Sequence, residues 1–178
     1  MGKRFPGNPK SSKALCETQG LSKFPMWYTG GVIRSKKRMA ITKEAFIAEL
    51  NHDLAYEFGA AVQYVQHAAT VTGAEYDAIS KELIIHSNEE MMHAVSLSNM
   101  ICDLGGVPGV DVEERQTSSI SKEMLEQDLA GEELAISRYK ERIAQAEALG
   151  EYGVRRLLED ILMMEEEHRR DLANTLGK

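Results

Sequence analysis

The amino-acid sequence predicts an all-α protein built as a four-helix bundle, and three observations support this fold class. From about residue 42 onward, apolar residues recur every three or four positions in four separate stretches, which is the period of amphipathic helices. Glycines and prolines mark the breaks between these stretches. No stretch shows the alternation of a strand or the pattern of a glycine-rich phosphate loop. An all-helical bundle follows from these observations.

The length and composition fit a single globular domain. The 178 residues are 43% hydrophobic and 28% charged, which is usual for a chain long enough to bury a core. No run of about eighteen apolar residues and no apolar leader segment is present, so we expect no membrane contact and a cytoplasmic location. Cys16 and Cys102 predict neither a disulfide framework nor a zinc site. We expect Cys102 to be a small core residue.

Residues 1–40 predict an irregular basic extension, which precedes a bundle domain over residues 41–178. Three prolines and five glycines interrupt any helical period in the extension. It carries nine Lys and Arg against the single acid Glu17, whereas the remaining residues carry twelve Lys and Arg against 27 acids. Two roles stay open for this arm. It packs on its own bundle or a neighbouring subunit, or it binds the phosphates of DNA.

The first two helices are predicted from their apolar stripes and their glycine stops. The first runs from about residue 42 to about residue 72 and ends at Gly73. The second carries stripe residues from Ile79 to Ile101 and stops at the glycine pair 105–106. Because the connection between them is short, we expect the two helices to form an antiparallel hairpin.

A long connection leads from this hairpin to a second one. It continues to about Ser121 and is rich in Gly, Pro, Ser and Thr. The third helix then carries stripe residues from Leu125 onward and ends near Gly150, and the fourth carries stripe residues from Val154 to Leu172. The short turn near Gly150 predicts the second hairpin. The long connection can cross the whole bundle and enter the third helix from the opposite end.

One pattern of metal-ligand type occurs twice in these helices. In each copy a glutamate precedes a Glu-x-x-His tetrapeptide by 33 residues. The members are Glu57, Glu90, His93, Glu132, Glu165 and His168. Residues three apart lie on one face of a helix, so each tetrapeptide can grip one metal ion. Four carboxylates at core positions, without Lys or Arg among them, repel one another unless cations are present. Carboxylate and imidazole ligands favour a pair of iron ions, with manganese as an alternative.

A single Glu-x-x-His is common on solvent-exposed helices, so the metal prediction depends on the repeat. Four neighbouring acids fall beside the stripes and are expected to face solvent or to line a cage. They are Glu89, Glu133, Glu166 and Glu167. His86, one turn before Glu90, is either close to the ligands or simply part of the core. Tyr64 and Tyr139 each follow a candidate ligand by seven residues. Each tyrosine either orients a carboxylate or takes part in one-electron chemistry, or is an ordinary core aromatic.

Four motifs resemble the helices of bacterioferritins. Residues 57–68, with Glu, Gln-Tyr and His-Ala in register, are similar to the first bacterioferritin helix, and Glu90-Met-Met-His-Ala to the second. Asp128-Leu followed by Glu132 resembles the third helix, and Glu165-Glu-x-His the fourth. Over residues 42–176 the chain thus resembles the ferritin superfamily. The resemblance implies two irons bound by the six residues of the repeat, with Glu90 and Glu165 bridging them. It also implies a hollow cage that oxidises Fe2+ and stores the product.

Three features depart from the ordinary bacterioferritin pattern. Only ten residues follow His168, too few for the fifth helix of the larger cages, so the chain looks closer to Dps-like proteins that assemble as dodecamers. Met91 stands where bacterioferritins present a methionine to haem b at a subunit twofold axis, although a helical methionine more often fills a core. The basic arm resembles the tails through which some Dps proteins bind DNA.

The expected function is a ferroxidase that oxidises Fe2+ with peroxide or O2. The expected catalytic residues are the six of the repeat together with Tyr64. A rubrerythrin-like diiron peroxidase without storage is an alternative. It is less favoured because Ala135 stands where rubrerythrins carry an extra glutamate and the chain has no Cys-x-x-Cys pair. DNA protection through residues 1–40 and a manganese catalase are further alternatives.

Overall fold

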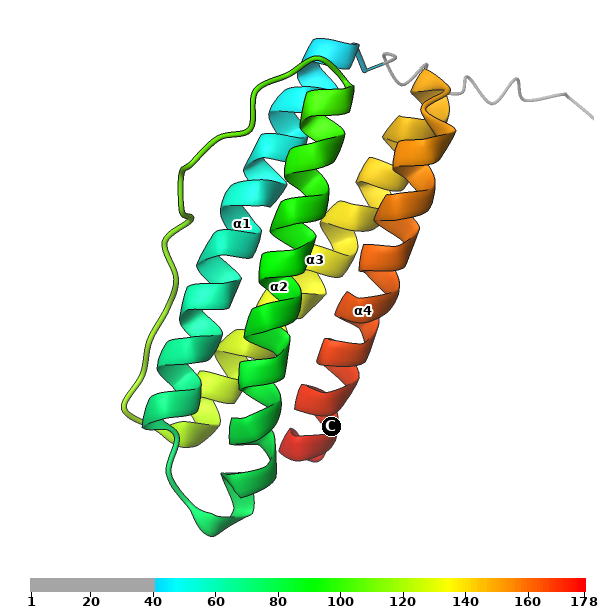
Figure 1. Cartoon of the computed structure of the whole chain (residues 1–178). Helices are drawn as coiled ribbons and strands as arrows, with labels where there is room; N and C mark the ends of the chain where they lie inside the picture. The colour runs from blue at the N-terminus through cyan, green and yellow to red at the C-terminus, as the bar shows by residue number, and fades with distance from the viewer. Residues whose placement is uncertain (1–40) are drawn as a thin grey trace, which may run out of the picture. The chain divides into compact units, whose positions relative to one another are not determined.

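The computed structural model describes residues 41–178, and the predicted extension of residues 1–40 lies outside the described residues. The described part is all-helical, as the sequence predicts (Figure 1). Its elements are α1 (Lys43–Thr70), the short 3-10 helix η1 (Ala74–Tyr76), α2 (Asp77–Asp103), α3 (Ser121–Leu149) and α4 (Tyr152–Leu176). None of these helices is long and apolar enough to cross a membrane.

The helix ends follow from local chemistry at a few residues. The hydroxyl of Thr42 accepts a hydrogen bond from the Ala45 N–H at 3.2 Å and caps the start of α1. Gly150 ends α3 in the left-handed conformation, with φ at +77°, where a residue without a Cβ is favoured. Gly73 has φ at +122° in the turn between α1 and α2. The glycines that the sequence marks as stops therefore do lie in the turns.

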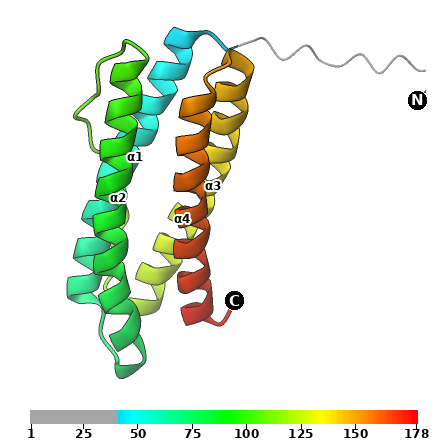
Figure 2. The ribbon, with the colours of Figure 1, turned by 45° about the vertical axis from the view of Figure 1, so that its right-hand side comes forward.

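The two hairpins α1–α2 and α3–α4 lie side by side, and residues 104–120 connect them along the outside of α1 (Figures 1 and 2). Backbone and amide groups of this crossover make four of its hydrogen bonds to α1, and the Arg115 guanidinium makes a fifth to the Tyr56 carbonyl. The first four are Asn51 Nδ2 to Val107 O, Gly109 N to Asn51 Oδ1, Glu113 N to Ala55 O and Gln116 N to Gln63 Oε1. The crossover is thus a strap with a defined path, and α3 enters the bundle from the end opposite to the one where α2 stops.

Gly59 permits the closest approach of this strap to α1. A Cβ built on Gly59 would lie 2.5 Å from the carbonyl oxygen of Glu113 and 2.8 Å from Nε of Arg115. Because the nearer atom is backbone, the strap itself has to move in a Gly59→Ala protein. We expect this variant to lose about 1–3 kcal/mol of unfolding free energy in urea titrations. Gly153→Ala, where the new Cβ meets nothing within 4 Å on α4, is the control and should not lose stability.

The core consists of two apolar clusters with a polar layer between them. One contains Phe46, Leu50, Leu54, Leu97, Ile101 and Leu158, and the other contains Ile79, Leu83, Leu125, Leu129 and Leu172. The prediction for Cys102 was wrong, because this side chain is exposed. Its neighbours Met100 and Ile101 are buried, so Cys102 falls on the outer side of α2 although it lies in an apolar run.

A buried ion pair joins Asp53 on α1 to Arg142 on α3 within the bundle. The guanidinium of Arg142 on α3 donates from Nε to Asp53 Oδ2 at 2.7 Å and also binds Glu49. Asp53 and Arg142 are 2% and 5% exposed. Burial raises the pKa of Asp53, while the charge of Arg142 opposes that rise. The pair joins α1 to α3, and neither charge has much contact with water.

Candidate metal centre

The six residues of the sequence repeat come together in the polar layer. They form two sets of four candidate ligands, and within each set one donor atom per residue lies within 4.8 Å of the others. The first set is Glu57, Glu90, His93 and Glu165; the second is Glu90, Glu132, Glu165 and His168. All six are 1–3% exposed. Glu90 and Glu165 belong to both sets, which is the arrangement needed to bridge two ions.

Both imidazoles direct Nδ1 into the centre. Nδ1 of His93 lies 2.9 Å from Glu90 Oε2 and 2.9 Å from Glu165 Oε1. Nδ1 of His168 lies 3.2 Å from Glu90 Oε1 and 3.8 Å from Glu165 Oε2. The three-residue spacing of each Glu-x-x-His pair therefore places its carboxylate and imidazole on one face, as helix geometry requires.

The outer nitrogens of the two imidazoles have different partners. Nε2 of His168 lies 2.8 Å from Oε2 of Glu89, a contact that fixes the tautomer with Nδ1 free to bind metal. Glu89 was expected only to face solvent or line a cage; it is partly exposed but also holds this imidazole. Nε2 of His93 instead lies 3.4 Å from the sulfur of Met164. No pattern in the sequence indicates a role for Met164.

Two tyrosines bind candidate ligands across the bundle. The Tyr64 hydroxyl on α1 donates to Glu132 on α3, and the Tyr139 hydroxyl on α3 donates to Glu57 on α1. Each hairpin thus supplies the phenol that orients the carboxylate of the other hairpin. These contacts leave the second carboxylate oxygen of Glu132 without a hydrogen bond.

A second buried polar group, which the sequence analysis did not assign, supports the centre from the α1–α3 side. Asp128 Oδ1 accepts a hydrogen bond from Gln63 Nε2 at 2.7 Å and lies 2.8 Å from His67 Nδ1. Gln63 in turn accepts the N–H of Gln116 from the strap at 3.2 Å. The signal in the sequence is that Gln63, His67 and Asp128 all stand in the motifs that resemble bacterioferritin helices.

The buried charges move the pKa values of the centre in opposite directions. Burial first, and then the charges of neighbouring glutamates, raises the pKa of Glu57 and of Glu132 well above the usual range. Burial and the charge of Glu90 raise the pKa of Glu165 to about 8. Burial acts on Glu90 too, but hydrogen bonds from the two imidazoles outweigh it and lower the pKa of Glu90. Burial by itself lowers the pKa of His168, but its hydrogen bond to Glu90 and the charge of Glu90 raise that pKa to about 9.

The donor atoms of the centre fit divalent metal ions. Within the described residues, four of its buried atoms make no hydrogen bond of good geometry, although imidazole nitrogens lie 2.9 and 3.2 Å from Glu165 Oε1 and Glu90 Oε1: Glu90 Oε1, Glu132 Oε2, Glu165 Oε1 and His168 Nδ1. Buried polar atoms of this kind are rare unless a ligand or water satisfies them. Lone pairs from carboxylates and imidazoles, converging on two positions, suit iron, manganese or zinc.

Metal affinity is expected to fall as the pH is lowered from about 8 to about 5. Glu57, Glu132 and Glu165 have raised pKa values, and each must lose its proton before both oxygens can bind a cation. At lower pH, protons compete more strongly with the cation for these carboxylate oxygens. The folding stability of the metal-free protein changes in the opposite sense. The pKa of Glu165 is about 8 in the folded chain against an ordinary 4.5, so the protonated carboxyl stabilises the fold at low pH. This stabilisation is lost as the pH rises from about 4.5 to about 8. Competition against a zinc-binding dye at several pH values measures the affinity, and a pH-independent affinity would contradict this prediction.

A narrow pocket between α1 and α3 reaches the centre from the strap. It is lined by Glu57, Gln63, Tyr64, Glu90, Arg115, Asp128, Glu132 and Glu165, among others. Arg115 stands at the strap side, where its guanidinium lies 3.6 Å from the ring centre of Tyr56 and donates to the Tyr56 carbonyl at 2.6 Å. The centre is therefore enclosed by side chains on this side and shielded from bulk water.

Comparison with known proteins agrees with this arrangement. The curated relatives include a bacterioferritin of Brucella melitensis, 36% identical over 68% of this chain and 76% of its own length. They also include a nutrient stress-induced DNA-binding protein of Nostoc, 33% identical over 66% of this chain and 69% of its own length.

Solved structures of ferritin-like proteins superpose on this chain. A ferritin-like diiron-carboxylate protein from Bacillus anthracis superposes with a TM-score of 0.72 at 31% identity, covering 75% of this chain and 96% of that one. A dodecameric, bacterioferritin-related thioferritin from Bacteroides fragilis has a TM-score of 0.72 at 30% identity, covering 78% and 88%. The model of the ferritin-like domain matches residues 47–178. The chain therefore belongs to the ferritin-like family.

Proposed function

We propose that this protein is a ferroxidase that binds two Fe2+ ions in the candidate metal centre and oxidises them with peroxide or O2. One observation carries the proposal: two sets of four buried ligands share Glu90 and Glu165. Shared carboxylates hold two ions close enough to give up their electrons together. Membership of the ferritin-like family supports iron oxidation or storage in general.

The reaction takes one electron from each of two Fe2+ ions. With peroxide, both electrons enter the O–O bond, which breaks to give two hydroxide ions; with O2, two electrons and two protons give peroxide. The protein supplies position and charge. Glu89 keeps His168 turned so that Nδ1 faces the ions, and the hydroxyls of Tyr64 and Tyr139 hold one oxygen each of Glu132 and Glu57. The enclosing side chains exclude water.

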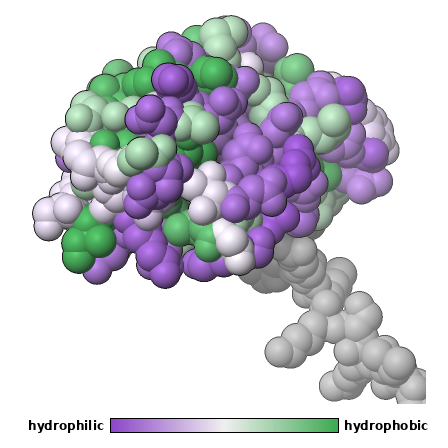
Figure 3. Space-filling view, turned by 90° about the horizontal axis from the view of Figure 1, so that it is seen from below, coloured by the Kyte–Doolittle hydropathy of each residue, from purple (hydrophilic) through white to green (hydrophobic). Residues whose placement is uncertain are grey.

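An assembly of many copies, a dodecamer by preference, fits the exposed apolar surface of the α1–α2 hairpin. Seven apolar side chains on these two helices are 44–61% exposed: Val62, Val65, Ile84, Ile85, Met91, Met92 and Val95. Figure 3 shows hydrophobic groups open to solvent among hydrophilic ones at the lower end of the bundle. Apolar surface of this kind marks contact sites between proteins. The thioferritin with the same fold is a dodecamer, which supports a cage.

Two further roles remain proposals attached to this one. Met91 is 44% exposed on α2, so it is not the core filler that its position suggested. An alternative role for its sulfur is to bind the iron of haem b at a subunit interface. DNA binding through residues 1–40 is supported by the excess of Lys and Arg there and by the name of the relative from Nostoc.

Iron retention on a sizing column tests the proposal. Fe2+ is added with peroxide, and the iron that elutes with the protein is counted per chain. Retention far above about two ions per chain, in a large particle, is expected for a ferroxidase with storage. Saturation near two ions in a small oligomer would instead indicate a rubrerythrin-like peroxidase. Fast peroxide decomposition with bound manganese and no Fe2+ oxidation would indicate a manganese catalase.

A further inference from the structure

We propose that Glu82, His86 and Asp171 form a separate mononuclear site for a divalent cation, one helical turn from the metal centre. The three residues lie on α2 and α4, and none belongs to the sequence repeat. One donor atom from each lies within 4.8 Å of the other two. Two carboxylates and one imidazole suit Fe2+, Mn2+ or Zn2+.

Helix geometry explains how the site is built. Glu82 and His86 are four residues apart on α2 and therefore project from one face. Asp171 reaches the same place from α4, three residues after His168. Nε2 of His86 lies 3.6 Å from Oδ2 of Asp171, which is too long for a hydrogen bond. Two donors that are each about 2.1 Å from one ion lie about 3 to 3.5 Å apart. The observed 3.6 Å is closer to this spacing between two ligands of one ion than to the length of a hydrogen bond.

The state of the His86 ring is the second observation. The residue is 1% exposed, and its Nδ1 is buried without a hydrogen-bond partner. The ring packs by stacking on His168 with ring centres 4.1 Å apart, and edge-on against Tyr64 at 5.5 Å. These contacts satisfy the faces of the ring, while Nε2 has Asp171 Oδ2 at 3.6 Å. With the proton on Nδ1, the lone pair of Nε2 faces Asp171 and is available to a cation held between the two residues.

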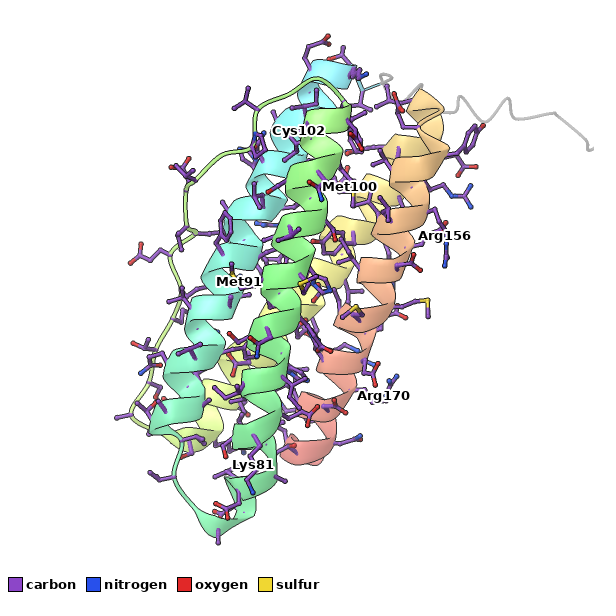
Figure 4. The ribbon with its side chains drawn as sticks, viewed as in Figure 1. Lys81, Met91, Met100, Cys102, Arg156 and Arg170 are labelled. Atoms are coloured by element: carbon purple, nitrogen blue, oxygen red, sulfur yellow. The ribbon has the colours of Figure 1, made fainter. Side chains whose placement is uncertain are left out.

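The site differs from the metal centre in its access to solvent. The side chain of Asp171 is 35% exposed, and Glu82 is partly exposed, whereas the residues of the centre are almost completely buried. Figure 4 labels the sequence neighbours Lys81 on α2 and Arg170 on α4 at the lower end of the bundle, and Arg170 points away from α2. A cation arriving at this face meets Asp171 and Glu82 first. It then lies next to His168, across the stacked rings.

Metal counting tests the site without using iron chemistry. Zn2+, which has no redox reactions, is titrated into the full chain, and bound metal is counted after dialysis. We expect about three ions per wild-type chain, two in the centre and one in the new site. The double variant Glu82→Gln with Asp171→Asn should bind about two. Glu133→Gln with Asp103→Asn, which changes exposed acids elsewhere on α3 and α2, should still bind about three.

Crystals soaked in Co2+ provide a direct test, because anomalous scattering locates each ion. A peak between His86 and Asp171 that disappears in the double variant is expected. Equal metal content in wild type and double variant, or no peak at this position, would overturn the proposal. A variant of the centre, Glu57→Gln with Glu132→Gln, should keep the peak.

A transit role for this site rests on the proposed ferroxidase function. If ions pass from the site to the centre, the double variant needs about 10-fold more Fe2+ to reach half its maximal oxidation rate, with the maximal rate unchanged. An unchanged Fe2+ dependence would overturn the transit role. The two proposals fail separately: a wild-type chain that shows the Co2+ peak but oxidises no Fe2+ contradicts the ferroxidase alone.

Discussion

Replacing Glu90 with glutamine is expected to slow Fe2+ oxidation by roughly 100-fold or more. Glu90 belongs to both ligand sets and is held between His93 and His168. Glutamine keeps the volume of the side chain but loses its charge and one of its two acceptor oxygens. By the proposed assignment, the two ions then lose a carboxylate that both of them share. Stopped-flow absorbance of the Fe3+ product, with peroxide as oxidant, measures the initial rate.

The control for this prediction is Glu133→Gln. Glu133 is exposed and lies beside Glu132 on α3, so the control removes the same charge from the same bundle without touching the centre. Circular dichroism should show helical, cooperatively melting protein for both variants. A Glu90→Gln protein that oxidises Fe2+ as fast as the control would refute the assignment of the centre.

Replacing Arg142 with methionine is expected to lower the unfolding free energy by about 3–5 kcal/mol, the largest stability effect predicted for this chain. The change leaves Asp53, which is 2% exposed, without the guanidinium that it binds at 2.7 Å. An unpaired buried carboxylate either carries a charge in the core or must take up a proton. Urea unfolding followed by circular dichroism measures the loss.

A second substitution separates the charge effect from the packing effect. Adding Asp53→Leu to Arg142→Met removes both charges, and most of the lost stability should return, because an apolar pair of similar volume often replaces a buried ion pair at little cost. Arg156→Met on α4 is the surface control (Figure 4). Arg156 is exposed and pairs with Asp160 at 2.6 Å, and its loss should cost less than about 1 kcal/mol. Equal losses for the two arginine variants would contradict the prediction.

The sequence predicts those parts of the molecule that depend on spacing along one helix. The Glu-x-x-His pairs, the apolar stripes and the glycine stops are local patterns, so the four helices and the gathering of the six repeat residues in one polar layer could be expected. The pairing of Asp53 with Arg142 could not, because 89 residues separate them and no period connects them. Which flanking residue turns inward also depends on the neighbouring helix.

Two residues illustrate this limit. Glu89 lies beside the stripe of α2, where the periodicity predicts exposure, yet α4 brings His168 within 2.8 Å of it. Cys102 lies in an apolar run, where composition predicts burial, yet the rotation of α2 turns it outward. In both cases the outcome depends on the packing of α2, which the local sequence does not encode.

The division of the ligands between the hairpins has a mechanical consequence. In each set of four, three residues come from one hairpin and the fourth is a glutamate from the other. An ion bound by either candidate set would fasten α1–α2 to α3–α4 in the same way that a cross-link does. In the metal-loaded protein the two hairpins would then be connected by the ion as well as by the strap. A chain cut by protease within residues 107–120 should fall into two fragments under mild denaturant when metal-free, and remain one particle when loaded.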